Sequence, residues 1–87
     1  MYAIKNKPKI DSIFEKLSKK DPKRLEAIAK KLNEITEDPH RFKPLSNIMK
    51  GFRRIHFGSF VLVYSIDEQN KVVTLEDYDH HDKIYRK

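Results

Sequence analysis

The segment that most constrains the fold is the run FVLVY at residues 60–64, in which every residue is apolar. A strand with one face in water alternates apolar and polar residues, so a run without alternation belongs at the centre of a sheet, covered on both sides. The runs FRRIHF (52–57) and KVVTLEDY (71–78) flank it, separated from it by Gly58 and by the polar turn DEQN (67–70). This spacing predicts a three-stranded antiparallel meander.

Two helices are predicted before the meander. The first follows Pro8, and the second begins at the candidate N-cap Asp21 with Pro22 in its first turn and stops at Asp38-Pro39. Their apolar residues repeat at helical spacing and form one stripe on each helix: Ile10, Ile13, Phe14 and Leu17, then Leu25, Ile28, Ala29, Leu32 and Ile35. We therefore expect an antiparallel helical hairpin.

The first segment, MYAIK, is short and apolar and is predicted to be a strand. The fold class that follows is α+β in the order β-α-α-β-β-β, an antiparallel sheet with the helical hairpin packed on one face. The other face of the sheet is expected to be open to a ligand. A chain of 87 residues has room for one small core, so residues 1–87 are expected to be a single domain.

The composition removes several kinds of chemistry. The chain has no cysteine, which excludes disulfides, thiolate metal sites and a thiol nucleophile. It has two glycines and no phosphate-binding GxxxxGK loop or nucleophile elbow, which argues against ATP-driven and acyl-transfer reactions. No apolar run is long enough for a membrane span, and the N-terminal residues lack the apolar stretch of a signal peptide. A cytoplasmic location without membrane partners is expected.

The charge is unevenly distributed. The chain carries 19 Lys and Arg against 13 Asp and Glu, a net charge of +6, and no acidic residue lies between Asp38 and Asp67. An uncompensated positive field of this kind favours a polyanion such as RNA, DNA or an acidic protein. A general lysine bias for solubility is the alternative, but it does not account for so long a stretch without an acid.

Arg54 and His56 lie two residues apart on a predicted strand, so their side chains project from the same face. If Ile55 and Phe57 face the helices, this pair faces the open side of the sheet. Ordinary alternation on a half-buried strand predicts polar residues there too, so the pair alone does not establish a site.

The C-terminal stretch EDYDHHDKIYRK (76–87) contains His80, His81 and Tyr85. Adjacent histidines in an extended segment point in different directions, and no HxxH or HExxH spacing is present, so no metal site is predicted. Acid-base chemistry by a histidine beside a carboxylate is one interpretation. A polar turn that caps a final helix, with Tyr85 as an anchor, is the other. The neighbouring carboxylates are Asp77, Asp79 and Asp82.

Taken together, KPLSNIMKGFRRIHFGSFVLVYSID followed by VVTLEDYDHHDKIY resembles the RelE/ParE superfamily of toxins from type II toxin-antitoxin systems. In that family a helical hairpin is followed by a connection with leucine and glycine, matched by Leu45 and Gly51. A strand with alternating basic residues, a "G-x-Y-R-h-h-Y" strand (h for hydrophobic) and a late "H/R-x-x-x-x-Y" element follow. Their counterparts are RIHF (54–57), GSFVLVY (58–64) and HHDKIY (80–85). The resemblance spans nearly the whole chain.

The resemblance to the RelE branch implies a microbial RNase-like fold and a metal-independent, cofactor-free endoribonuclease that cuts mRNA on the ribosome. It implies that Arg54 stabilises the phosphate, that His56 and His81 move protons with His80 in support, and that Tyr85 orients or stacks on a base. Other basic residues would steer ribosomal RNA: Lys43, Lys50 and Arg53. The implied partners are the ribosome, mRNA and an acidic, partly disordered RelB-like antitoxin, in a heterodimer or heterotetramer.

One position departs from the family pattern. The phosphate-binding arginine that commonly follows the aromatic residue of the third strand is Val61 here. Two alternatives therefore stay open: a ParE-like inhibitor of DNA gyrase without catalytic residues, and a catalytically weak, basic RNA-binding module.

Overall fold

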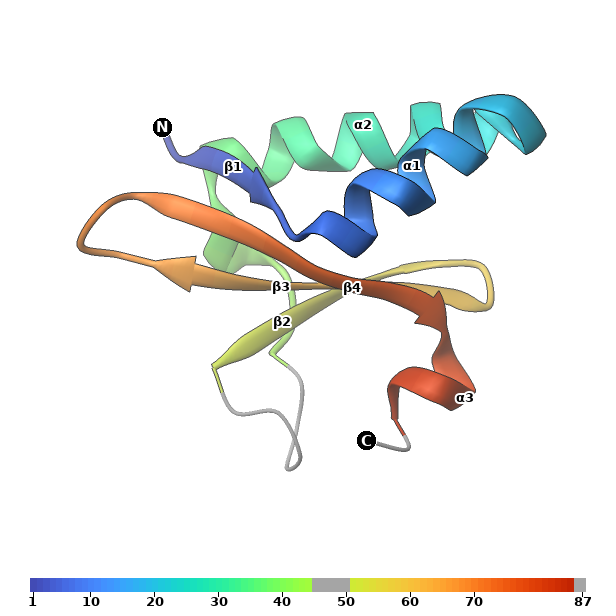
Figure 1. The fold of residues 1–87 in the computed structure, drawn as a ribbon. Helices are drawn as coiled ribbons and strands as arrows, with labels where there is room; N and C mark the ends of the chain where they lie inside the picture. The colour runs from blue at the N-terminus through green and yellow to red at the C-terminus, as the bar shows by residue number, and fades with distance from the viewer. Residues whose placement is uncertain (45–50, 86–87) are drawn as a thin grey trace.

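The computed structural model describes residues 1–44 and 51–85. The elements follow one another as two long helices after a first strand, then a meander and a short last helix (Figure 1). Their bounds are β1 (Ala3–Asn6), α1 (Pro8–Lys20), α2 (Pro22–Glu37), the 3-10 turn η1 (Pro39–Arg41), β2 (Phe52–Phe57), β3 (Phe60–Asp67), β4 (Val72–His80) and α3 (His81–Ile84). The predicted α+β class is confirmed.

The sheet has the strand order β1-β4-β3-β2. Strands β2, β3 and β4 form the predicted antiparallel meander, with β3 between the other two. Strand β1 instead pairs with β4 in parallel, from Ala3 opposite Val72 to Asn6 opposite Leu75. The sheet is therefore mixed rather than wholly antiparallel, because the helical hairpin returns the chain to the far edge and leaves β1 beside the last strand.

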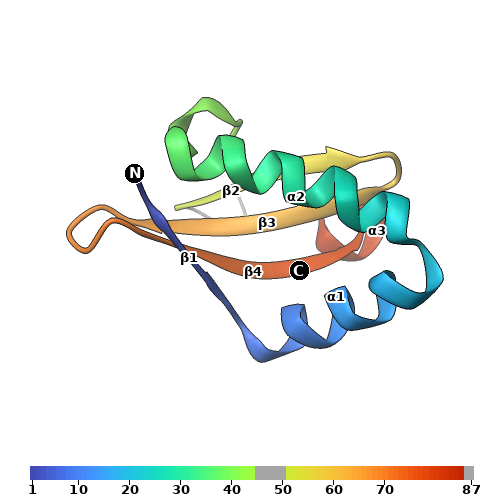
Figure 2. The same ribbon diagram turned by 90° about the horizontal axis from the view of Figure 1, so that it is seen from above.

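The two long helices begin and end where the sequence signals lie. The Asp21 carboxylate accepts a hydrogen bond from the backbone N–H of Arg24 at 3.1 Å and caps α2, while each helix has proline in its first turn. Both helices cover the same side of the sheet (Figures 1 and 2). Their buried residues meet those of the strands in one core of Ile10, Ile28, Ile35, Ile55, Phe57, Leu62, Tyr64, Val73, Leu75 and Tyr78.

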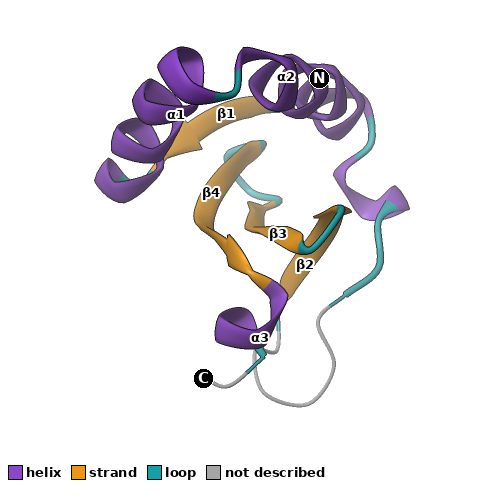
Figure 3. Cartoon of the chain, turned by 90° about the vertical axis from the view of Figure 1, so that its right-hand side faces the viewer, coloured by secondary structure: helices purple, strands orange, loops and turns teal. Residues whose placement is uncertain are grey.

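The opposite side of the sheet is partly covered. Helix α3 lies there, across the sheet from α1 and α2 (Figure 3). Its Ile84 is 2% exposed and packs with Val61 and Val63 of β3, beside the partly buried Phe52. The expected open face is therefore open only around this small second core, because β3 is apolar on both sides and needs a cover on each.

The connection after α2 is fixed to the sheet by one buried hydroxyl. Tyr64 of β3 donates a hydrogen bond to the backbone carbonyl oxygen of Pro39 at 2.6 Å, and burial raises the pKa of Tyr64 to about 12. Residues 39–42 are thereby placed next to β2. No helix in the described part of the chain is long and apolar enough to cross a membrane.

Candidate active site

The side chains of β2 alternate as the sequence predicts. Ile55 and Phe57 are buried under the helices, whereas Arg54 and His56 point to the side on which α3 lies. The register places His56 beside Val61 and Arg54 beside Val63 on the neighbouring strand. The two polar side chains therefore border the small apolar core beneath α3.

Tyr85, the residue that follows α3, contacts His56 of β2. Its hydroxyl lies 3.4 Å from Nε2 of His56, and the two rings have their centroids 6.4 Å apart at an angle of 33°. Tyr85 follows Ile84, whose side chain is held in the second core, and remains 40% exposed. The docking of α3 thus brings an exposed phenol to an exposed imidazole across 29 residues of sequence.

Burial, the Arg54 guanidinium and then His81 lower the pKa of His56 below its ordinary value of 6.5. Each cause acts against the charged imidazolium: burial removes water from it, and the positive guanidinium of Arg54 repels it. His56 is therefore a neutral imidazole near neutral pH, the form that accepts a proton.

His80 and His81 do not diverge as expected. Their rings stack with centroids 4.8 Å apart at 27°, because the chain turns from strand to helix between them. Asp82 lies beside both, with a carboxylate oxygen 3.6 Å from Nδ1 of His80 and 3.1 Å from Nδ1 of His81. The sequence places three carboxylates near the histidines, Asp77, Asp79 and Asp82. The structure brings the side chain of Asp82 to both imidazole rings.

His80 also caps the final helix, which was the second interpretation of the C-terminal histidines. Its Nδ1 accepts a hydrogen bond of 3.3 Å from the backbone N–H of Asp82, so it caps α3. The three side chains His80, His81 and Asp82 offer ligand atoms within 4.8 Å of one another, so within the described residues this group could hold a metal ion. Sequence spacing had argued against such convergence.

Arg54 differs sharply from its neighbour Arg53. Within the described residues, the guanidinium of Arg54 has no hydrogen bond or ion pair, so it is available to a phosphate. Arg53 instead donates to the backbone carbonyl oxygens of Phe42 at 2.7 Å and His40 at 3.3 Å. It holds the chain after η1 in place, and its side chain lies on the other face of β2.

The remaining predicted RNA-binding residues are only partly placed. Lys43 is exposed, and its carbonyl oxygen accepts a hydrogen bond from the backbone N–H of Arg54 at 3.1 Å, so it lies beside the start of the site. Lys50, like Leu45 of the quoted family motif, lies outside the described residues.

Val61 is completely buried beneath Ile84. The position where the family commonly has an arginine is therefore filled by packing against α3. Asp79 of β4 lies beside Val61 in the register. The residue that sequence reasoning missed here is Ile84, which carries Tyr85 into place.

Comparison with known proteins agrees with this architecture. The sequence profile of the family described as "ParE toxin of type II toxin-antitoxin system, parDE" matches residues 5–85. A protein of Methanocaldococcus jannaschii, provisionally named toxin RelE4, is 51% identical over 88 residues that cover 100% of this chain and 94% of that protein. An uncharacterised protein of Methanosarcina mazei is 56% identical over 86 residues, covering 98% of this chain and all of that one.

Solved structures share the fold. The isolated RelE toxin of E. coli superposes with a TM-score of 0.76 at 21% identity, covering 99% of this chain and 98% of that one. A chain of the RelBE2 toxin-antitoxin complex of Mycobacterium tuberculosis gives a TM-score of 0.75 at 25% identity, covering 91% of this chain and 96% of that one. The chain belongs to the RelE/ParE superfamily of toxins from type II toxin-antitoxin systems.

Proposed function

We propose that this chain is a RelE-like toxin, a single domain over residues 1–87, that cuts mRNA on the ribosome in the cytoplasm and so stops translation. The observation that carries the proposal is the contact between Tyr85 and His56 at 3.4 Å, with the unpaired Arg54 two residues away on the same face. An apolar or structural role would not need a neutral imidazole, a phenol and a free guanidinium together at the surface.

The proposed reaction is a transphosphorylation without a metal ion or cofactor. His56 removes the proton of a ribose 2′-hydroxyl, whose oxygen forms a bond to the adjacent phosphorus while the bond from phosphorus to the 5′-oxygen breaks. His81 donates a proton to that leaving oxygen, and Arg54 stabilises the negative charge on the phosphoryl oxygens. His80 and Asp82 hold His81 in position, and Tyr85 orients or stacks on a base.

The buried Val61 predicts a slower enzyme than a family member with arginine there. One cation of the family pattern is replaced by a side chain packed under Ile84, so Arg54 has to stabilise the phosphorane without it.

A partner protein would control the toxin. The structural relatives include the intact RelBE complex of E. coli, a YoeB-YefM complex of Staphylococcus aureus and a RelE variant bound to an antitoxin peptide. By analogy, we propose that an acidic, partly disordered RelB-like antitoxin binds this chain in a heterodimer or heterotetramer.

The test is primer extension on an mRNA in a translating extract that contains the protein. We expect cuts that require ribosomes, with Arg54→Ala and His81→Ala each lowering the cleavage rate by about 100-fold or more. Arg41→Ala is the matched control, because Arg41 is an exposed arginine paired with Glu34 at 3.2 Å, outside the site, and its removal should leave cleavage unchanged. Intact mRNA at saturating toxin would overturn the proposal.

The second candidate is an inhibitor of DNA gyrase. It is favoured by the match to the profile named for ParE and by the loss of the arginine at Val61. A supercoiling assay with purified gyrase separates the two: inhibited supercoiling together with undisturbed translation supports this candidate. A basic module that binds RNA without cutting it would retain ribosome binding in the same extract but give no cuts.

A further inference from the structure

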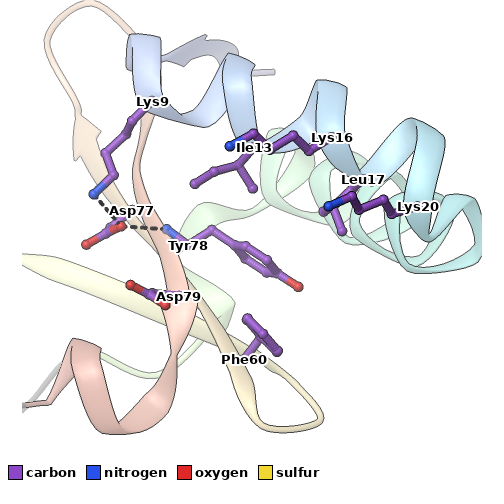
Figure 4. A pocket seen from close by; sticks show the side chains of 9 residues that line it. All are labelled: Lys9, Ile13, Lys16, Leu17, Lys20, Phe60, Asp77, Tyr78 and Asp79. Carbon is purple, nitrogen blue, oxygen red and sulfur yellow. Dashed lines mark hydrogen bonds and ion pairs between the residues drawn. The ribbon is translucent and has the colours of Figure 1, made fainter.

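A cavity of about 310 Å³ lies between α1 and the end of β4 (Figure 4). Its lining residue Phe60 also meets the ring of His80, with centroids 5.8 Å apart, so the cavity borders the proposed nuclease site. Ile13 and Leu17 of α1 form one wall, and the rings of Phe60 and Tyr78 form the other. The two rings stack with centroids 5.4 Å apart, and Phe60 is 37% exposed. The cavity is therefore an apolar slot that opens at the surface and accepts an apolar side chain.

The sheet edge along this cavity is incomplete. Strand β1 covers β4 only from Val72 to Leu75, so residues 76–80 have no neighbouring strand on that side within the described chain. The helix α1 that follows β1 runs beside this part of β4 instead, as seen from above in Figure 2.

The backbone of this edge is capped by its own side chains. The N–H of Tyr78 donates to Oδ1 of Asp77 at 2.9 Å, and the N–H of His80 donates to Oδ1 of Asp79 at 2.8 Å. N–H groups alternate along a strand, and that of His81 reaches the carbonyl oxygen of Ser59 on the β3 side, so those of Tyr78 and His80 point to the free edge. Carboxylates placed this way satisfy the donors of an edge that has no partner strand, and a peptide carbonyl can replace them.

The charges around the cavity select the kind of partner. Asp77 is held by Lys9 at 2.8 Å, whereas Lys16 and Lys20 on the rim have no ion pair within the described residues. Two free ammonium groups favour an acidic partner. The backbone N–H groups of Tyr78 and His80 suit the regularly spaced carbonyl oxygens of an extended peptide, so we consider a peptide rather than RNA.

We propose that an extended, acidic segment of a partner protein adds to the sheet beside residues 76–80, with an apolar side chain in the cavity and acidic side chains at Lys16 and Lys20. This mode of binding takes its affinity from main-chain hydrogen bonds and its specificity from alternate side-chain pockets. The identification of the partner as the antitoxin rests on the proposed function. The proposal that residues 76–80 are a docking edge does not depend on it.

Fluorescence anisotropy with a labelled seven-residue peptide of alternating leucine and glutamate tests the site. We expect binding that falls by about tenfold or more in the double variant Lys16→Glu, Lys20→Glu. The matched control is Lys19→Glu, Lys23→Glu, which makes the same change of charge on α1 and α2 at positions that do not line the cavity, and it should bind within about twofold of the parent.

Amide NMR of the same samples reports on strand addition. The signals of the Tyr78 and His80 N–H groups should shift and exchange more slowly with solvent when the peptide binds. No binding at millimolar peptide, equal loss in both double variants, equal binding of a leucine-lysine peptide, or unchanged Tyr78 and His80 amides would each overturn the proposal. So would displacement of the peptide by an oligoribonucleotide. The experiment contains no ribosomes, so its failure is distinct from failure of the cleavage assay.

Discussion

His56 shows most directly how one residue acquires its chemistry from its surroundings. A histidine on the solvated face of a strand would titrate near 6.5, but burial, Arg54 and His81 all oppose the charged imidazole and lower its pKa. The group stays neutral over a wider range of pH than a free histidine. A neutral imidazole is the state needed to take a proton from a 2′-hydroxyl.

The dependence of cleavage on pH should follow this lowered pKa. As pH falls, cleavage should persist through 6.5 and decline only below it, because protonation of His56 removes the base. Single-turnover cleavage measured between pH 5 and 8 gives the acidic limb. Arg54→Gln is informative here, since removing the guanidinium charge should move the limb toward higher pH as well as slow the reaction. A limb above 6.5 in the parent protein would contradict the assignment of His56 as the base.

At the scale of elements, α3 is a short helix with a large effect. It has four residues, yet Ile84 covers Val61 and Val63 and carries Tyr85 to His56. A helix of this length is not stable by itself, so its position depends on the packing of that one isoleucine. The site is thus assembled by a contact between the last helix and the central strand.

Ile84→Ala should disconnect the site with a limited loss of stability. Truncating a buried isoleucine costs about 2 kcal/mol or more in the free energy of unfolding, and here the lower end is expected because α3 can move away from the sheet. Cleavage should fall on the order of tenfold or more, since small displacements of catalytic groups are costly. Urea unfolding and cleavage rate measured together provide the check.

Lys83→Ala is the matched control for this variant, because Lys83 lies in the same helix and is exposed. Both measurements should match the parent protein. If Ile84→Ala kept full cleavage while its stability fell, Tyr85 and the docking of α3 would have no part in the reaction.

The elements that the sequence predicts are those with a local signal. The stripes of α1 and α2 and the fully apolar β3 arise from burial that each segment needs by itself, so their periods appear in the sequence. The parallel partner of β1 depends on the route of the chain through two helices, which no local pattern encodes. For the same reason the stacking of His80 on His81 could not be predicted: it depends on a turn set by docking of Ile84.

At the scale of the whole molecule, tertiary contacts redistribute the positive charge of the middle segment. No acid lies between Asp38 and Asp67 in sequence, but Arg41 pairs with Glu34 of α2 and Arg53 is bound by backbone carbonyl oxygens. The field that a polyanion meets is therefore concentrated on fewer cations than the sequence count indicates. Arg54 and Lys43 remain, because neither side chain has a partner in the described part of the chain, and Arg54 is the one on the same strand face as His56.

This distribution predicts how RNA binding depends on salt. Each phosphate contact releases counterions, so the logarithm of the affinity for single-stranded RNA falls with the logarithm of salt concentration, by about 0.7 in slope per contact. Arg54→Ala should reduce the slope by about that amount, whereas Arg41→Ala should leave it unchanged, because Arg41 is already paired with Glu34. Filter binding of an oligoribonucleotide between 50 and 300 mM salt measures both slopes. Equal slopes in the two variants would mean that phosphates do not distinguish the free arginine from the paired one, and the electrostatic argument for Arg54 would then be wrong.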